Sequence, residues 1–102
     1  MSTLTLLVTY TALPGQRDKF LQEVDESGLP ERVRKESGCL KYDYYRSADN
    51  ENQILLVERW SSAAAQTVHL AKPHMLALVS LKKKYISGTD VIKLSDPKKK
   101  KK

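Results

Sequence analysis

Residues 39–60 read C-L-K-Y-D-Y-Y-R-S-A-D-N-E-N-Q-I-L-L-V-E-R-W, and this stretch decides the fold. Residues 39–46 and 54–60 are rich in aromatic and branched side chains, which favour strands. The polar, Asn-containing segment between them, residues 48–53, is typical of a turn. We therefore expect the two strands to pair as a β-hairpin.

The segments on either side of the hairpin extend this pattern. Apolar and Thr residues alternate over 3–11, which predicts a strand, and another strand is expected at 85–94 with an interruption at Gly88. Amphipathic stretches predict helices, and their ranges are 16–26, 31–36, 63–71 and 74–84. The order β-α-β-β-α-β is that of a ferredoxin-like α+β fold, with a four-stranded antiparallel sheet covered by helices on one face.

The apolar run I-L-L-V at residues 54–57 also bears on assembly. A strand with one wet face alternates between apolar and polar residues, so this strand is expected to be covered on both faces. The helices are numerous enough to cover only one. We therefore expect a homodimer in which two sheets pack face to face.

The charge is concentrated at one end of the chain. The 102 residues include 18 Lys and Arg against 12 Asp and Glu, a net charge of +6, but five of the lysines are residues 98–102. We expect a single domain at 1–96 and a disordered Lys-rich tail, native or a tag, at 97–102. The nearly balanced remainder argues against specific nucleic-acid binding.

Other features concern the compartment. The single cysteine, Cys39, excludes an intramolecular disulfide and fits a reducing compartment. No apolar run approaches the roughly 20 residues of a membrane helix, and the N-terminus lacks the basic region of a signal peptide. We expect a soluble, cytoplasmic protein that does not associate with membranes.

Glu58 and Trp60 are the first candidate site residues. They lie two apart on the strand 54–60 and so share a face with Leu56. We expect this face to point inward, because the alternative would bury Arg59. A buried carboxylate needs a partner, so Glu58 either pairs with Arg59 or a lysine, or has a functional role.

Two histidines flank Pro73 late in the chain. His69 and His74 are either packed core residues or functional ones. His74 is expected in the first turn of its helix, where the helix dipole disfavours imidazolium, and a neutral imidazole suits a general base. Their spacing argues against a metal triad with Glu58, and no metal is expected.

Three tyrosines are candidates for lining a pocket. Tyr42 and Tyr44 share one face of their strand, and Tyr45 takes the other. Tyr10, on the first strand, is a further candidate, because a tyrosine hydroxyl can serve as a donor inside a cavity. Cys39 is interpreted as a small buried apolar residue.

Three segments together resemble the antibiotic biosynthesis monooxygenase domain family. They are E-S-G-C-L-K-Y-D-Y-Y-R at 36–46, L-V-E-R-W at 56–60 and H-L-A-K-P-H-M at 69–75. The resemblance implies a dimeric α/β barrel with a pocket between sheet and helices in each subunit. It also implies that Glu58, Trp60, His69 and His74 are site residues.

The resemblance further implies a monooxygenase that acts on a small phenol or quinol with O2 and without a cofactor. His69 or His74 would be the base, Glu58 would orient it, and Trp60 would form a wall. The first strand lacks the Asn of the haem-degrading branch. Alternatives are a proton-transfer enzyme or isomerase acting on a phosphorylated signal metabolite, and a non-catalytic dimeric module that binds small molecules.

Overall fold

A computed structural model describes residues 3–95 of the chain. Its elements are β1 (Leu4–Ala12), α1 (Arg17–Glu26), α2 (Leu29–Arg34), β2 (Cys39–Arg46), β3 (Gln53–Trp60), α3 (Ala63–Leu70), α4 (Met75–Tyr85) and β4 (Ile86–Ser95). The expected Lys-rich tail at 97–102 lies outside the described residues. Within them, no helix combines the length and the apolar character that crossing a membrane requires.

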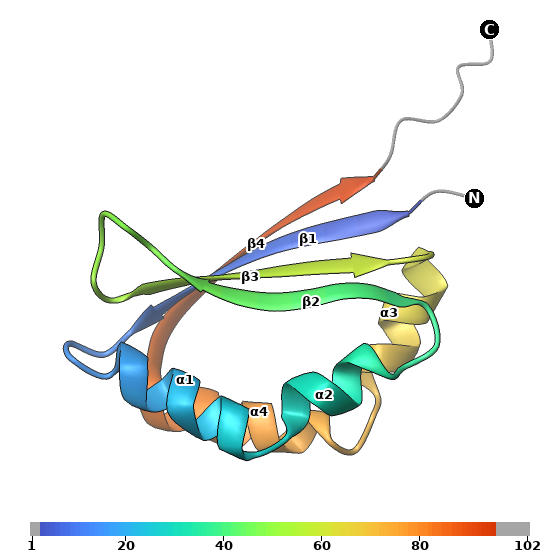
Figure 1. Ribbon diagram of the computed structural model, residues 1–102. Coiled ribbons are helices and arrows are strands. Elements are labelled where there is room, and N and C mark those ends of the chain that lie inside the picture. The colour runs from blue at the N-terminus through green and yellow to red at the C-terminus, as the bar shows by residue number, and fades with distance from the viewer. Residues whose placement is uncertain (1–2, 96–102) are drawn as a thin grey trace, which may run out of the picture.

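The four strands form one antiparallel sheet in the order β2-β3-β1-β4. All the helices lie on one face of this sheet, and the other face carries none (Figure 1). The ferredoxin-like α+β fold expected from the element order is therefore confirmed.

Alternating burial along β1 and β3 sets the two faces of the sheet. Every second residue of each strand is buried, and the antiparallel register pairs Leu4 with Trp60 and Leu6 with Glu58. The expectation that Glu58 and Trp60 point inward is thus confirmed. Arg59 lies on the opposite face, where its guanidinium reaches Thr5 Oγ1 at 3.3 Å.

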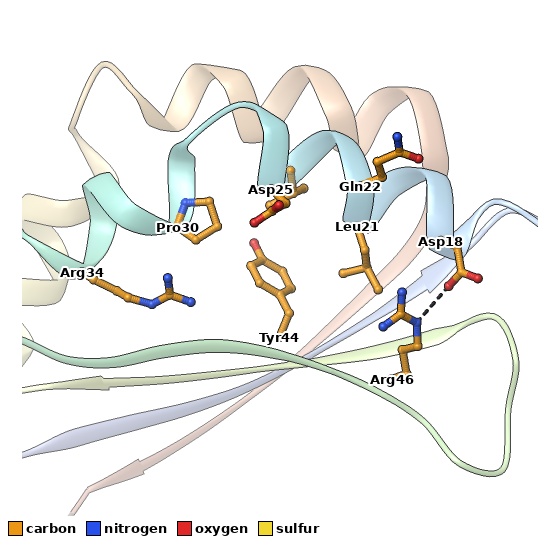
Figure 2. Close-up of a pocket in the computed structure, with 9 residues that line it drawn as sticks. Asp18, Leu21, Gln22, Asp25, Pro30, Arg34, Tyr44 and Arg46 are labelled. Atoms are coloured by element: carbon orange, nitrogen blue, oxygen red, sulfur yellow. Dashed lines mark hydrogen bonds and ion pairs between the residues drawn. The ribbon is translucent and has the colours of Figure 1, made fainter.

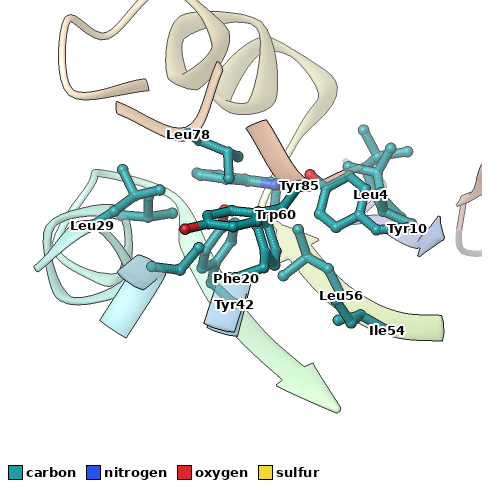
Figure 3. Packing of buried hydrophobic residues seen from close by; sticks show 14 residues of the cluster. Leu4, Tyr10, Phe20, Leu29, Tyr42, Ile54, Leu56, Trp60, Leu78 and Tyr85 are labelled. Atoms are coloured by element: carbon teal, nitrogen blue, oxygen red, sulfur yellow. The ribbon is translucent and has the colours of Figure 1, made fainter. Parts of the chain in front are cut away.

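The core between sheet and helices is dominated by aromatic rings. Trp60, Tyr42 and Phe20 are essentially inaccessible to solvent, and Figure 3 shows them packed close together. Phe20 on α1 makes edge contacts with Tyr10 at 5.8 Å and with Tyr85 at 6.4 Å between ring centroids. These contacts tie α1 to both β1 and the end of α4.

Two boundaries near the C-terminus differ from the sequence-based expectation. Tyr85 ends α4 instead of beginning the last strand, because its ring packs against Phe20 and its hydroxyl donates to the Glu23 carboxylate on α1. Gly88 does not interrupt β4. Instead, the register with β1 shifts between Thr11 and Ala12.

Gly38 shapes the turn that leads into β2. Its φ is +87°, and a Cβ built there would lie 2.6 Å from the Ala65 Cβ and 2.8 Å from the Ser61 Oγ. Its carbonyl also accepts a hydrogen bond from the Ser61 N–H at 2.8 Å. The turn therefore packs directly against the start of α3, which the side chain of Ser62 caps by accepting from the Ala65 N–H.

Replacement of this glycine tests the close approach. We expect Gly38→Ala to lower the free energy of unfolding by about 1–3 kcal/mol through backbone strain alone, and further through overlap with α3. Gly15→Ala is the control, since Gly15 has a φ of +77° but no atom within 4 Å of its built Cβ. Urea denaturation should show the larger loss for Gly38→Ala. Equal losses would contradict the packing argument.

Candidate active site

The central feature of the site is a buried carboxylate shared by two imidazoles. The Nδ1 atom of His69 lies 3.0 Å from Glu36 Oε2, and the Nε2 atom of His74 lies 2.7 Å from the same oxygen. The side chains of Glu36 and His69 are 5% and 1% exposed, and that of His74 is 18% exposed. The cluster thus runs from the interior at His69 to the surface at His74.

Local structure brings these three residues together. Glu36 follows α2 in the tight turn before β2, where its own N–H donates to the Val33 carbonyl. His69 lies in the last turn of α3, and His74 is the N-cap of α4. Pro73 lies between the two helices, so the chain turns sharply and places both imidazoles against one carboxylate.

The shared carboxylate determines the tautomer of His69. An ionised carboxylate only accepts hydrogen bonds, so Nδ1 of His69 and Nε2 of His74 carry the protons directed at Glu36. The proton on one ring nitrogen leaves the lone pair of a neutral imidazole on the other. In neutral His69 this is Nε2, which makes His69 competent to accept a proton.

Glu58 and Trp60 form a second buried pair beside His69. The Trp60 indole N–H donates to Glu58 Oε1 at 3.0 Å, and the Trp60 ring lies 4.6 Å from the His69 ring between centroids. Burial raises the pKa of Glu58, an effect opposed by the Trp60 hydrogen bond and by His69. The nearby Glu36 charge acts in the same direction as burial.

A cavity of about 450 Å³ lies between the sheet and the helices α3 and α4. On the sheet side it is lined by Leu6, Val8, Tyr10, Tyr42, Glu58, Thr89, Val91 and Lys93. On the helix side it is lined by Gln66, His69, Leu70, Met75, Leu78, Val79 and Lys82. A cavity that combines apolar side chains with polar groups and an oriented imidazole has the character of a small-molecule site.

The structure brings together four of the predicted site residues at this cavity: Glu58, His69, Tyr10 and Tyr42. Burial raises the pKa of both tyrosines far above the ordinary value, so their hydroxyls remain protonated.

Three of the predicted site residues make contacts that do not match the roles expected for them. Trp60 lies behind His69 and is not part of the cavity lining. Neither is His74, which bonds the same Glu36 oxygen as His69 does. Nor does Glu58 orient a histidine, because its hydrogen bond goes to Trp60 while Glu36 bonds both imidazoles.

Tyr44 lines a different groove, of about 520 Å³, between β2 and the helices α1 and α2. Figure 2 shows its ring rising toward Asp25 and Pro30, with Arg34 and Arg46 on either side. These arginines already have partners, since Arg34 pairs with Asp43 at 3.3 Å and Arg46 with Asp18 at 2.9 Å. The groove contains no histidine, so we place the site in the smaller, apolar cavity.

The cavity and the groove are separated by the side chains of Tyr42 and Tyr44. The hydroxyls of Tyr42, which lines the cavity, and Tyr44, which lines the groove, lie 3.1 Å apart. Their rings also meet edge to face, with centroids 5.6 Å apart.

The structure offers no metal site among the described residues. No group of three His, Cys, Asp or Glu in residues 3–95 has an arrangement that would hold an ion.

The chain is similar to known proteins in sequence and in fold. The family model described as antibiotic biosynthesis monooxygenase matches residues 3–81. The chain belongs to this family. "Putative monooxygenase YcnE" of Bacillus subtilis is 30% identical over 81 residues, covering 78% of this chain and 83% of the relative. "Putative monooxygenase Rv0793" of Mycobacterium tuberculosis is 32% identical over 75 residues, covering 74% of this chain and 71% of the relative.

Solved structures show the same fold. The crystal structure of PA3566 from Pseudomonas aeruginosa matches with a TM-score of 0.84 and 26% identity, covering 96% of this chain and 97% of that one. The structure of Rv0793 matches with a TM-score of 0.81. The family and these relatives support a monooxygenase-like role for the chain.

Glu36 is the member of the candidate site that sequence reasoning missed. It is separated from His69 by 33 positions and from His74 by 38, so no local spacing reveals the cluster. The one available signal was its place at the head of the segment 36–46, the first of the three that resemble the family.

The raised pKa of Glu58 predicts a specific pH dependence of stability. Because the folded state binds this proton more tightly than the unfolded chain, the contribution of Glu58 to the free energy of unfolding falls as pH rises through its unfolded and then its folded pKa. Glu58→Gln removes this titration and keeps an oxygen for the Trp60 N–H. We expect the variant to gain stability relative to the wild type as pH rises above about 4, the ordinary pKa of a glutamate.

Urea denaturation at a series of pH values measures this difference. Glu51→Gln is the control, since Glu51 is exposed in the turn before β3. Its difference from the wild type in free energy of unfolding should change less with pH than that of Glu58→Gln. A Glu58→Gln difference that stays constant as pH rises would contradict the prediction.

Proposed function

We propose that this protein is a monooxygenase that oxidises a small aromatic, quinol-type substrate with O2 and needs no cofactor. The observation that carries the proposal is the position of His69, which lines an apolar cavity while its Nδ1–H is bound to a buried carboxylate. A base oriented in this way inside a poorly hydrated pocket is what deprotonation of a phenol requires.

The proposed reaction begins with transfer of the phenolic proton to His69 Nε2. The resulting anion gives one electron to O2, and the two radicals combine to form a carbon–oxygen bond. The resulting peroxide anion takes back the proton from His69. Loss of water, which removes the outer oxygen and the hydrogen of the ring carbon, then leaves the other oxygen atom on that carbon as a carbonyl. Both electron pairs that reduce O2 come from the bonds of the substrate.

The surrounding residues have distinct roles in this proposal. Glu36 acts as a positioning residue, because it fixes the His69 tautomer and stabilises the imidazolium after proton transfer. The protonated hydroxyl of Tyr42, whose ring lies 6.1 Å from that of His69 between centroids, is available as a donor to the developing charge on oxygen. Leu6, Val8 and Leu78 exclude water from the ring.

Oxygen uptake with a panel of hydroquinones, corrected for autoxidation, tests this proposal. We expect His69→Gln to lower the rate by about 10²–10⁴-fold, the usual contribution of a general base. His74→Gln is the matched control, because His74 bonds the same carboxylate from outside the cavity, and it should cost less than about tenfold. Uptake that His69→Gln leaves unchanged, in a folded variant, would refute the role of His69.

We also propose that the protein forms a homodimer through the uncovered face of the sheet. Across this face, Val57 on β3, Leu7 on β1 and Ile92 on β4 lie side by side in register. Leu55 and Leu94 extend the patch, and Ile92 remains 56% exposed in a single chain. A continuous apolar patch of this kind is unusual on a monomer, and no helix covers it (Figure 1).

An aspartate in this patch should prevent association. In a two-fold symmetric interface each substitution occurs twice, so Val57→Asp would bury two carboxylates without partners. Sedimentation equilibrium should show a dimer for the wild type and a monomer for Val57→Asp. Leu76→Asp, at an apolar residue 69% exposed on the helix side, should leave the dimer intact. A monomeric wild type would refute the proposal.

A further inference from the structure

A half-buried lysine lies at one end of the cavity. Lys82 projects from the third turn of α4, lines the cavity, and holds its ammonium nitrogen 4.9 Å from the centroid of the Tyr10 ring. Partial burial lowers the pKa of Lys82. Loss of hydration at an ammonium is costly unless an anion or a π-face replaces the water, and here only the aromatic ring does so.

No carboxylate of the described residues 3–95 pairs with Lys82. The only carboxylate that lines the cavity there is Glu58, which lies opposite Leu6 in the sheet. Tyr10, beneath Lys82, is four residues farther along β1, or about 13 Å at the usual rise of a strand. Lys82 therefore faces an apolar slot without a counter-ion.

The second cavity lysine has a different environment. Lys93 on β4 pairs in register with Leu6, whose other neighbour is Glu58. It therefore belongs to the same end of the cavity as Glu58 and His69. Lys82 is the cation at the opposite end, beside Tyr10 and Thr89.

We propose that the substrate of this cavity is an aromatic acid, whose carboxylate or phosphate binds Lys82 while its reacting hydroxyl meets His69. The assignment of the reacting end rests on the proposed function. Leu78 and Val79, which precede Lys82 on α4, line the cavity on its helix side. They would pack against the aromatic ring of the substrate. Because the backbone positions that mark the two ends, Leu6 and Tyr10, lie about 13 Å apart along β1, a fused ring system spans more of the cavity than a single ring does.

Calorimetric titration of the full-length protein with matched naphthalene derivatives tests this assignment. The probes are 2-naphthoate, the neutral isostere 2-naphthamide, and 2-naphthyl phosphate. We expect the wild type to bind an anionic probe at least about tenfold more tightly than the amide, as is usual for a hydrogen bond to a charged group. The stronger of the two anions identifies carboxylate or phosphate as the natural group.

Variants of Lys82 separate its charge from its packing. Lys82→Gln should abolish the preference for the anion while leaving the affinity for 2-naphthamide unchanged, and Lys82→Arg should retain the preference. Lys83→Gln, which removes an exposed neighbouring charge, should behave as the wild type.

Three results would overturn the inference: equal affinity of the wild type for acid and amide, a preference that survives Lys82→Gln, or no binding of any probe. Because these titrations need neither O2 nor turnover, they fail independently of the oxygen-uptake experiment. Anion preference without oxygen uptake would reject the monooxygenase proposal and retain the class of ligand.

Discussion

The site depends on one buried carboxylate. Glu36 accepts hydrogen bonds from His69 and His74, and this joins the turn after α2 to the corner between α3 and α4. Burial of a carboxylate without hydrogen-bond donors costs several kcal/mol. Glu36 therefore needs the donors of both imidazoles, and each imidazole is held in place by its bond to Glu36. The corner is thereby fixed against the sheet, and the position of His69 at the end of the cavity follows from it.

Most of the fold could be predicted from local pattern. The inward face of β3 followed from comparing two costs, the burial of a paired Glu58 and the burial of Arg59, and the structure agrees. The order of strands and helices was equally local. The end of α4 was not, because a contact between Tyr85 and Phe20, distant in sequence, extends the helix by one residue past the expected end.

The site itself was predictable only in part. The family resemblance implied that Glu58 orients a histidine, whereas the structure pairs Glu58 with Trp60, two residues away on the same face. That short-range bond was within reach of strand geometry. The bonds of Glu36 were not, because they depend on how two distant turns meet after the sheet has formed, which no periodicity encodes.

The two carboxylates beside His69, Glu36 and Glu58, lie in different environments. Glu36 receives N–H donors from two imidazoles, whereas Glu58 receives one indole N–H and lies against apolar side chains of the cavity. Burial raises the pKa of Glu58, so this group holds a proton more readily than an ordinary carboxylate. Neighbouring titratable groups with divergent environments divide acid and base roles between them. In the proposed reaction the base is His69 on geometric grounds, because its Nδ1–H is anchored on Glu36 and its Nε2 is left to accept the substrate proton.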